Sequence, residues 1–221
     1  KNLAIKVGID PSKIVVIFPG IEKPTQIKES TKIEAEKIFN NSFPRIITVS
    51  RLDKRKGHDK ILMLIKNLKP KFPKIKYISI GLGKEKENLI KLAKELSIEK
   101  EVLFLENIEE NLKLSLIAEA DLFLMPSRIE GRSIEGFGIS FIEAASYGVG
   151  SIGGKDGGAS DAISHNKTGL ICDGNDLNSI YEAVENFLDK NKFVEFGKNA
   201  KKFSEDFHWN KVVKKYLELI N

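Results

Sequence analysis

The sequence predicts an α/β protein built on a parallel sheet with helices on both faces. Short β-branched or apolar runs alternate with amphipathic helical stretches along most of the chain. Strands that alternate with helices of this length form parallel sheets covered on both sides. The spacing between the predicted strands is variable, which argues against a solenoid of regular repeats.

The predicted elements follow one another in a simple order. The expected strands cover 14–18, 45–50, 76–80, 102–106, 121–125, 149–153 and 169–172. The expected helices lie near 31–39, 57–68, 85–96, 110–119, 139–147 and 176–189, with further helices from about 192. The beginning of the chain is less regular and contains a Pro-Gly turn. We therefore interpret residues 1–27 as a connector and residues 28–221 as one domain.

Composition limits the classes of protein to consider. With 41% hydrophobic and 30% charged residues, the 221-residue chain is typical of a soluble globular protein. Its longest purely apolar run, 61–65, is far shorter than the roughly 20 residues of a membrane span. The single cysteine, Cys172, excludes an internal disulfide and fits a reducing compartment. The start has no initiating Met and no signal peptide, so we expect a fragment of a cytoplasmic protein.

The positive charge of the chain does not favour nucleic-acid binding. The net charge is +5, but lysines outnumber arginines 31 to 5 and are scattered among glutamates. This distribution is typical of a solvated surface, whereas nucleic-acid sites gather arginines and aromatics on one face. Four of the five arginines lie just beyond predicted strands: Arg51, Arg55, Arg128 and Arg132.

The motif VSRLDKRKGHD follows the second predicted strand. Arg51 and Lys56 lie in the loop after this strand, and Gly57 opens the next helix. A helix N-terminus carries free amides and the positive end of the helix dipole, which favour a phosphate group. The two cations would reinforce such a site, or else form an exposed basic turn.

Two further glycine-rich loops follow predicted strands. In GLGKEKENL a dinucleotide fingerprint would require a third glycine at position 86, which is Lys86, so nicotinamide or flavin binding is unsupported. Gly81 and Gly83 would still allow a ligand to approach the backbone closely. The segment GGKDGGASDAI is expected to line the same edge of the sheet. Alternatively, its glycines and aspartates only form a turn.

The segment RIEGRSIEGFGISFIEA joins the fifth predicted strand to a helix. Glu135 precedes Gly136-Phe137-Gly138, and Glu143 lies eight residues further on, two turns into the helix. The glycines leave backbone amides uncovered at the helix start, which suits an anion. A carboxylate suits a pair of vicinal hydroxyls on a sugar. The segment therefore predicts a ligand that is part anion and part polyol, although Glu135 could instead cap the helix and Glu143 lie on the surface.

Other catalytic arrangements are absent from the sequence. There is no Asp-x-Asp pair and no His/Cys cluster with metal-ligand spacing, so we expect no metal and no cofactor. The histidines His58, His165 and His208 are expected at surface or capping positions. No Ser-His-Asp or nucleophilic cysteine arrangement is evident.

These motifs together resemble a known enzyme family. The order SRL-x3-KG, GxG, PS…EGFGI-x3-EA, GG-x2-D and TGL resembles the C-terminal, donor-binding half of retaining group 1 glycosyltransferases. These glycogen-synthase-like enzymes have the B-type fold of two Rossmann-like domains, so the resemblance implies a Rossmann-like parallel sheet with helices on both faces here. The resemblance covers roughly residues 12–190, and the PSRIEGRSIEGFG segment is similar to the phosphatidylinositol mannosyltransferase branch. One departure is GVGSIGG, where the family commonly has a proline after the first glycine.

The resemblance implies a role for each motif. It assigns Arg51 and Lys56 to the donor diphosphate, and Glu143 to the ribose hydroxyls. It places Glu135, the candidate catalytic residue, beside the transferred sugar. Four further positions match donor-contacting residues of the family: Phe137, Gly138 and Ile139 in the loop whose amides contact sugar and phosphate, and Ile108 beside the base.

The resemblance also implies the reaction and the partners. The expected activity is retaining transfer of a hexose from a nucleoside-diphosphate sugar, such as GDP-mannose or a UDP-hexose, to a glycan or lipid-linked acceptor. The acceptor would bind through an N-terminal domain that precedes this fragment, so the fragment alone is expected to be inactive. Peripheral association with the inner face of the membrane stays open. Two alternatives also stay open: a sugar-nucleotide epimerase of related fold, and a non-catalytic nucleotide-sugar-binding module.

Overall fold

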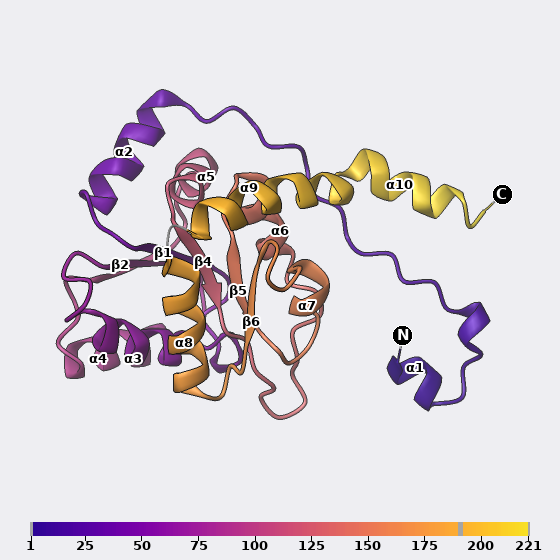
Figure 1. The fold of residues 1–221 in the computed structure, drawn as a ribbon, viewed down its shortest axis with the longest axis horizontal. Coiled ribbons are helices and arrows are strands. Elements are labelled where there is room, and N and C mark those ends of the chain that lie inside the picture. The colour runs from indigo at the N-terminus through magenta and orange to yellow at the C-terminus, as the bar shows by residue number, and fades with distance from the viewer. Residues whose placement is uncertain (1, 190–191, 221) are drawn as a thin grey trace.

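A six-stranded parallel sheet forms the centre of the protein (Figure 1). The computed structural model describes residues 2–189 and 192–220. The strands lie in the order β3-β2-β1-β4-β5-β6, and every neighbouring pair is parallel. They are β1 (Arg45–Val49), β2 (Lys76–Ile80), β3 (Val102–Leu105), β4 (Leu122–Met125), β5 (Ser151–Gly154) and β6 (Gly169–Cys172). The predicted Rossmann-like sheet is confirmed.

Helices cover both faces of the sheet, which explains why its central strands are apolar on both sides. In β1, Ile46 belongs to one apolar core and its neighbour Ile47 to the other, because successive strand residues point to opposite faces. The first core is closed by α3 (His58–Leu68), α4 (Lys86–Glu95) and α8 (Leu177–Leu188). The second is closed by α2 (Glu29–Phe39), α5 (Glu110–Ala118), α6 (Ile139–Ser146) and α7 (Ala159–Ala162).

The helix ends follow local sequence signals. The helix α8 begins after Asp176, whose side chain accepts a hydrogen bond from the Asn178 amide at 2.9 Å. The helix α2 ends at Phe39 and is followed by Asn40, which adopts the left-handed conformation with φ +48°. Two more helices, α9 (Lys192–Ser204) and α10 (Trp209–Leu217), end the described chain. The six helices predicted inside the sheet region all begin and end within two residues of their expected bounds.

One predicted strand is wrong. Residues 14–18 form no strand and belong to an arm that holds α1 (Asn2–Lys6) and the short 3-10 helix η1 (Pro11–Lys13). Figure 1 shows this arm leaving α2, passing the start of α10 and running away from the sheet. Val15 and Val16 are 58% and 47% exposed. A strand needs a neighbour for its backbone hydrogen bonds, and no described strand lies beside this segment.

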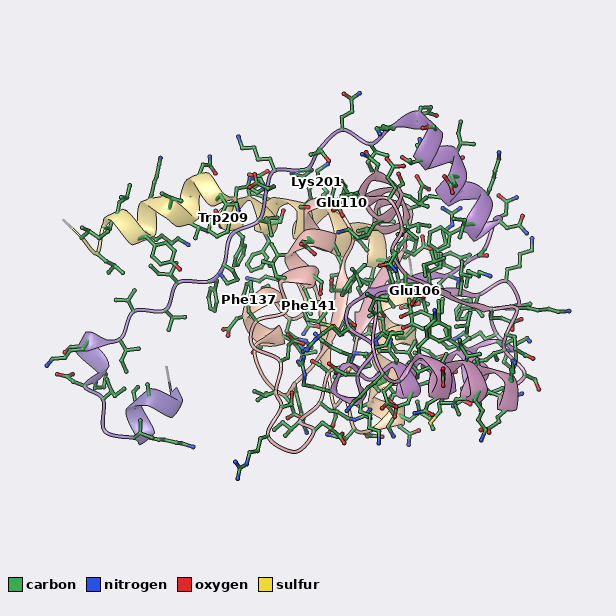
Figure 2. The ribbon with its side chains drawn as sticks, turned by 180° about the vertical axis from the view of Figure 1, so that it is seen from behind. Glu106, Glu110, Phe137, Phe141, Lys201 and Trp209 are labelled. Atoms are coloured by element: carbon green, nitrogen blue, oxygen red, sulfur yellow. The ribbon has the colours of Figure 1, made fainter. Side chains whose placement is uncertain are left out.

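The end of the arm is joined to the C-terminal part of the chain. The Ile21 amide donates to the Phe207 carbonyl at 2.8 Å, and the Trp209 amide donates to the Ile21 carbonyl at 3.1 Å. Gly20 is needed beside this contact, because a Cβ there would lie 2.6 Å from the Trp209 ring. Figure 2 shows Trp209 and Phe137 on the side of the domain along which the arm passes.

The strand order places the topological switch point of the sheet between β1 and β4. Ile47 of β1 is level with Ile78 of β2 on one side and with Phe123 of β4 on the other. The chain therefore winds outward in both directions from β1 and β4. Ligands of such sheets bind beyond the carboxyl ends of the strands at this switch point. The loops that follow β1 and β4, residues 50–57 and 126–138, lie at that position.

Candidate functional site

The loops after β1 and β4 are packed directly against each other. The first loop contains the 3-10 helix η2 (Lys54–Lys56) and ends at Gly57, which has φ +77°. A Cβ at Gly57 would lie 2.6 Å from the carbonyl oxygen of Pro126 in the second loop. The Arg128 amide donates to the Arg55 carbonyl at 2.9 Å. Glycine at position 57 therefore allows both the left-handed turn and the close approach of the two loops.

A buried ion cluster links these loops. The Oε2 atom of Glu135 accepts hydrogen bonds from Lys56 Nζ at 2.5 Å and from Arg55 Nη1 at 2.8 Å. Arg55, Lys56 and Glu135 are only 6%, 8% and 8% exposed. The Oδ2 atom of Asp53 lies 3.9 Å from Arg55 Nη2. We call Asp53, Arg55, Lys56 and Glu135 the strand-end ion cluster.

The cluster keeps Glu135 ionised. Burial by itself would raise the pKa of this carboxyl group. The hydrogen bond and charge of Lys56, together with the charge and hydrogen bond of Arg55, outweigh burial and lower the pKa of Glu135 below its usual value. The cluster therefore holds two buried cations and one buried carboxylate at the switch point of the sheet, with the half-buried carboxylate of Asp53 beside them.

Arg51 and Lys56 are not brought into direct contact. Lys56 is buried in the ion cluster, whereas the Arg51 side chain is 74% exposed. Arg51 Nη2 lies 3.6 Å from Asp53 Oδ2. Arg51 and Arg55 also line a hollow of about 570 Å³, together with Asp53, Gly83 and Glu130. Arg51 is therefore an exposed cation, paired with Asp53, at the mouth of the site. Arg55 is the second buried cation beside Lys56.

Arg55 was not among the predicted site residues. Its place beyond a strand in an arginine-poor chain was a signal, but the motif pairs Arg51 with Lys56 and leaves position 55 unspecified. Only the turn of η2 shows that Arg55 and Lys56 reach the same carboxylate oxygen.

The Gly-Phe-Gly turn is held by a second glycine loop. Gly138 has φ +80° and precedes α6 without a side-chain cap, so the first amides of this helix are not covered by a capping side chain. The Gly158 amide donates to the Glu135 carbonyl at 2.9 Å. A Cβ at Gly158 would lie 2.0 Å from the Gly136 carbonyl oxygen. The segment GGKDGGASD, residues 153–161, thus supports the turn.

Phe137 and Ile139 take structural positions next to this turn. The Phe137 ring stacks on Phe18 of the arm, with ring centroids 4.7 Å apart, and lies 5.7 Å from the Phe207 ring. Ile139 is half-buried and packs against the second apolar core. Their side chains are thus used in packing, and their backbone amides remain the groups that a ligand could contact.

Glu143 lies in a different hollow from the ion cluster. It is half-buried on α6 and lines a hollow of about 420 Å³ with Glu110, Lys113, Tyr147 and Trp209. Burial raises the pKa of Glu143, Lys113 acts in the opposite direction, and Glu110 adds to the rise. Figure 2 shows Glu110 on the side of the domain where the arm joins α2. Ile108 packs against the second apolar core just before α5 and does not line this hollow.

Gly81 and Gly83 serve a contact within the protein. A Cβ at Gly81 would lie 2.0 Å from the Ser50 carbonyl oxygen, and one at Gly83 would lie 2.2 Å from the Leu52 carbonyl oxygen. These glycines therefore let the loop after β2 support the loop after β1. The close approach of a ligand at these two glycines stays a prediction.

His58 is buried, contrary to its expected surface or capping position. Its Nδ1 lies 2.9 Å from the Tyr77 hydroxyl, and its Nε2 lies 3.1 Å from Ser50 Oγ and 3.3 Å from the Arg51 carbonyl. Burial, the largest effect, lowers the pKa of His58 to about 4, so it is neutral at physiological pH. His58 therefore fixes the start of the loop that carries Arg51.

Two further findings concern metal and membrane. Within residues 2–189 and 192–220, no group of three or more His, Cys, Asp or Glu side chains is placed to hold a metal ion. None of the helices in the same ranges has the length and apolar character needed to cross a membrane.

The sequence identifies the family to which this arrangement belongs. Residues 29–203 match the family described as "Glycosyl transferases group 1". The chain belongs to this family. A similar protein is the GDP-mannose-dependent alpha-(1-6)-phosphatidylinositol monomannoside mannosyltransferase of Mycobacterium tuberculosis, 30% identical over 80% of this chain and 47% of its own length. This group 1 glycosyltransferase chain thus spans about half the length of that relative.

Solved structures agree with the fold. A glycosyltransferase from Rickettsia africae superposes with a TM-score of 0.83 at 20% identity, over 99% of this chain and 59% of that one. HepE from Anabaena, solved in complex with UDP, gives a TM-score of 0.82 at 20% identity, over 98% of this chain and 59% of that one. The predicted resemblance to group 1 glycosyltransferases is confirmed for both family and fold.

Proposed function

We propose that this chain is the donor-binding half of a retaining glycosyltransferase. The whole enzyme would transfer a hexose from a nucleoside-diphosphate sugar to a glycan or lipid-linked acceptor. The observation that carries the proposal is the strand-end ion cluster, which places two buried cations at the switch point beside the uncapped start of α6. Cations and helix amides together suit a diphosphate.

The proposed chemistry is electrostatic stabilisation of the leaving group. When the bond between sugar and phosphate breaks, negative charge grows on the departing diphosphate. Lys56 and the exposed Arg51 would stabilise that charge, together with the amides of Phe137, Gly138 and Ile139. No metal or other cofactor is required in this proposal, because protein cations fill the role of the leaving-group clamp.

The remaining donor contacts follow from position. Glu135, beside the turn, would face the hexose and the positive charge that develops at its anomeric carbon. Glu143 would accept hydrogen bonds from the ribose hydroxyls, and its half-buried place in the α6 hollow supports this role. Ile108 would lie beside the base. The names of the related proteins support either guanine or uracil as that base.

The acceptor is proposed to bind outside this chain. The relative from M. tuberculosis acts on a phosphatidylinositol mannoside, which favours a lipid-linked acceptor and peripheral contact with the inner face of a membrane. Transfer needs the acceptor held close to the donor carbon in a closed cleft. We therefore expect the chain alone to bind donor and to transfer no sugar at a useful rate.

Calorimetry with charge-matched variants tests this function. UDP and GDP, with uridine and guanosine as comparison ligands, are titrated into the 221-residue chain in the presence of EDTA. We expect binding without metal. Arg51→Ala and Lys56→Ala should each weaken diphosphate binding by roughly tenfold to a hundredfold, the effect of about 1.5–3 kcal/mol, and leave nucleoside binding almost unchanged.

The control removes a lysine elsewhere. Lys66→Ala, at an exposed position near the end of α3, causes the same change in net charge. It should leave the affinity for both the diphosphates and the nucleosides unchanged. Circular dichroism checks that each variant is folded. Equal losses of affinity for nucleoside and diphosphate would place Arg51 and Lys56 outside the diphosphate site. Diphosphate binding that requires Mg²⁺ or Mn²⁺ would contradict the proposal that the donor binds without metal.

A further inference from the structure

One carboxylate oxygen serves two cations in the strand-end ion cluster. Lys56 Nζ and Arg55 Nη1 both donate to Oε2 of Glu135, at 2.5 and 2.8 Å. All three residues are buried, with exposed fractions of 6% for Arg55 and 8% for Lys56 and Glu135. If Lys56 binds the donor diphosphate, it must share or leave its contact with Glu135.

If Lys56 were the sole partner of Glu135, loss of its contact would leave the carboxylate without a cation. The carboxylate would be buried next to the negative charges of two phosphate groups. A buried carboxylate without a cation partner tends to bind a proton and become neutral. Glu135 could then no longer stabilise positive charge on the sugar. The cluster therefore needs a cation that remains on Glu135 when the donor is bound.

Arg55 is anchored in a way that lets it stay beside Glu135 when the donor binds. Its backbone carbonyl accepts the Arg128 amide at 2.9 Å. Arg128 is itself held by Asp59 through two hydrogen bonds of 2.9 and 3.1 Å. The Nη2 atom of Arg55 lies 3.9 Å from Asp53. Its planar guanidinium is a more rigid partner than the flexible ammonium of Lys56.

We propose that Arg55 is a positioning residue that keeps Glu135 ionised and in place when Lys56 turns to the donor diphosphate. This inference rests on the proposed function. Arg55 acts through Glu135 and is not itself required to touch the sugar. The Nε of Arg55 is buried and has no hydrogen-bond partner among the described residues, so this guanidinium also has a donor to spare.

Within residues 2–189 and 192–220, no third Lys, Arg or His nitrogen lies within 4.0 Å of the Glu135 carboxylate. Lys56 and Arg55 are the two charged groups that lower the pKa of Glu135, against the effect of burial. The glycine loop after β5 contributes a backbone contact, from Gly158 to the Glu135 carbonyl. Lys155 of that loop pairs instead with Asp173 at 2.6 Å.

Proton uptake on donor binding tests the inference. UDP-glucose and GDP-mannose are the probes, because their diphosphates carry no group that titrates near neutral pH. Calorimetry at about pH 6, in buffers with different ionisation enthalpies, counts the protons taken up per bound donor. For the wild-type chain we expect none. For Arg55→Met we expect Glu135 to take up as much as about one proton per bound donor. The donor affinity of this variant should then fall by up to about tenfold for each pH unit above about pH 6.

Three variants make the result specific. Arg55→Lys should restore binding without proton uptake, because it returns a cation to Glu135. Adding Glu135→Gln to Arg55→Met should abolish the uptake, because the titrating group is gone. Lys66→Met, at an exposed position near the end of α3, removes the same charge and should behave like the wild type.

The outcomes separate the two proposals. If Arg55→Met binds donor with no more proton uptake than the wild type, Arg55 does not hold Glu135 and the inference is wrong. If the wild-type chain binds neither donor, the proposed function itself fails. Arg55→Gln, which is polar and uncharged, replaces the methionine variant if that variant folds poorly, and the same proton uptake is expected.

Discussion

Glu143 is a residue whose charge costs stability in the free protein. Its half-buried place on α6 raises its pKa above that of the unfolded chain, and Glu110 adds to the effect. For an acid with a raised folded-state pKa, the ionised form disfavours folding. The cost is absent below the unfolded-state pKa, and it grows as the pH rises through that value to the folded-state pKa.

Glu143→Gln should therefore stabilise the free chain and weaken the donor site. At about pH 7 we expect the unfolding temperature to rise by roughly 1–3 °C, and the gain to vanish near about pH 3–4. The same variant should bind UDP and GDP more weakly, because the ribose hydroxyls lose a charged acceptor. Thermal unfolding across this pH range measures the first effect. Glu182→Gln, exposed on α8, is the control, and an equal stability change in both variants would contradict the account.

At the residue scale, sequence patterns predicted the chemical types of the site better than its contacts. The burial of Lys56 and the exposure of Arg51 depend on the turn of η2, which spacing alone does not reveal. Arg55 escaped prediction for the same reason. The roles of Glu135 and Glu143 stay predictions, and the structure places them in different surroundings.

At the element scale, the glycine loop after β5 supports the turn before α6. Gly158 has an ordinary φ of −90°, so glycine is needed there for space and not for conformation. An added Cβ would lie 2.0 Å from the Gly136 carbonyl oxygen, so the two loops would have to separate.

We expect Gly158→Ala to destabilise the chain by about 1–3 kcal/mol, the usual cost of overpacking. It should also weaken diphosphate binding, because the amides after Gly136 would move. Urea unfolding and UDP titration measure the two effects. Gly136→Ala is a matched control for stability, since a Cβ there meets no atom within 4 Å. Equal stability of the two variants would show that the loops do not depend on this contact.

Most elements were predictable because their signals are local. Helices such as α3 and α8 show apolar residues at helical spacing, and strands such as β1 are short apolar runs between turns. The run at 14–18 has the same composition as a strand but lacks a partner in the sheet. Composition reports a preference for extended backbone and does not reveal whether a neighbouring strand exists.

At the scale of the whole molecule, the order of the strands makes the site. The alternation of strands and helices predicted a parallel sheet, but not that β1 and β4 are neighbours. The pairing of β1 with β4 brings residues 50–57 against residues 126–138, although residues 58–125 lie between them in the sequence. A long-range pairing of this kind has no local signal, and only the resemblance to group 1 glycosyltransferases implied it.

The central claim is that a sugar-nucleotide diphosphate binds where these two loops meet. The most direct measurement is amide-resolved NMR of the 221-residue chain, titrated with UDP or GDP to about 1 mM without metal. We predict saturable shifts that gather in residues 51–57 and 135–139 and around Glu143, and uridine or guanosine should leave the first two groups unmoved. Shifts confined to another surface, such as the hollow between Lys167 and Lys211, or no saturable shift with either diphosphate, would contradict the account.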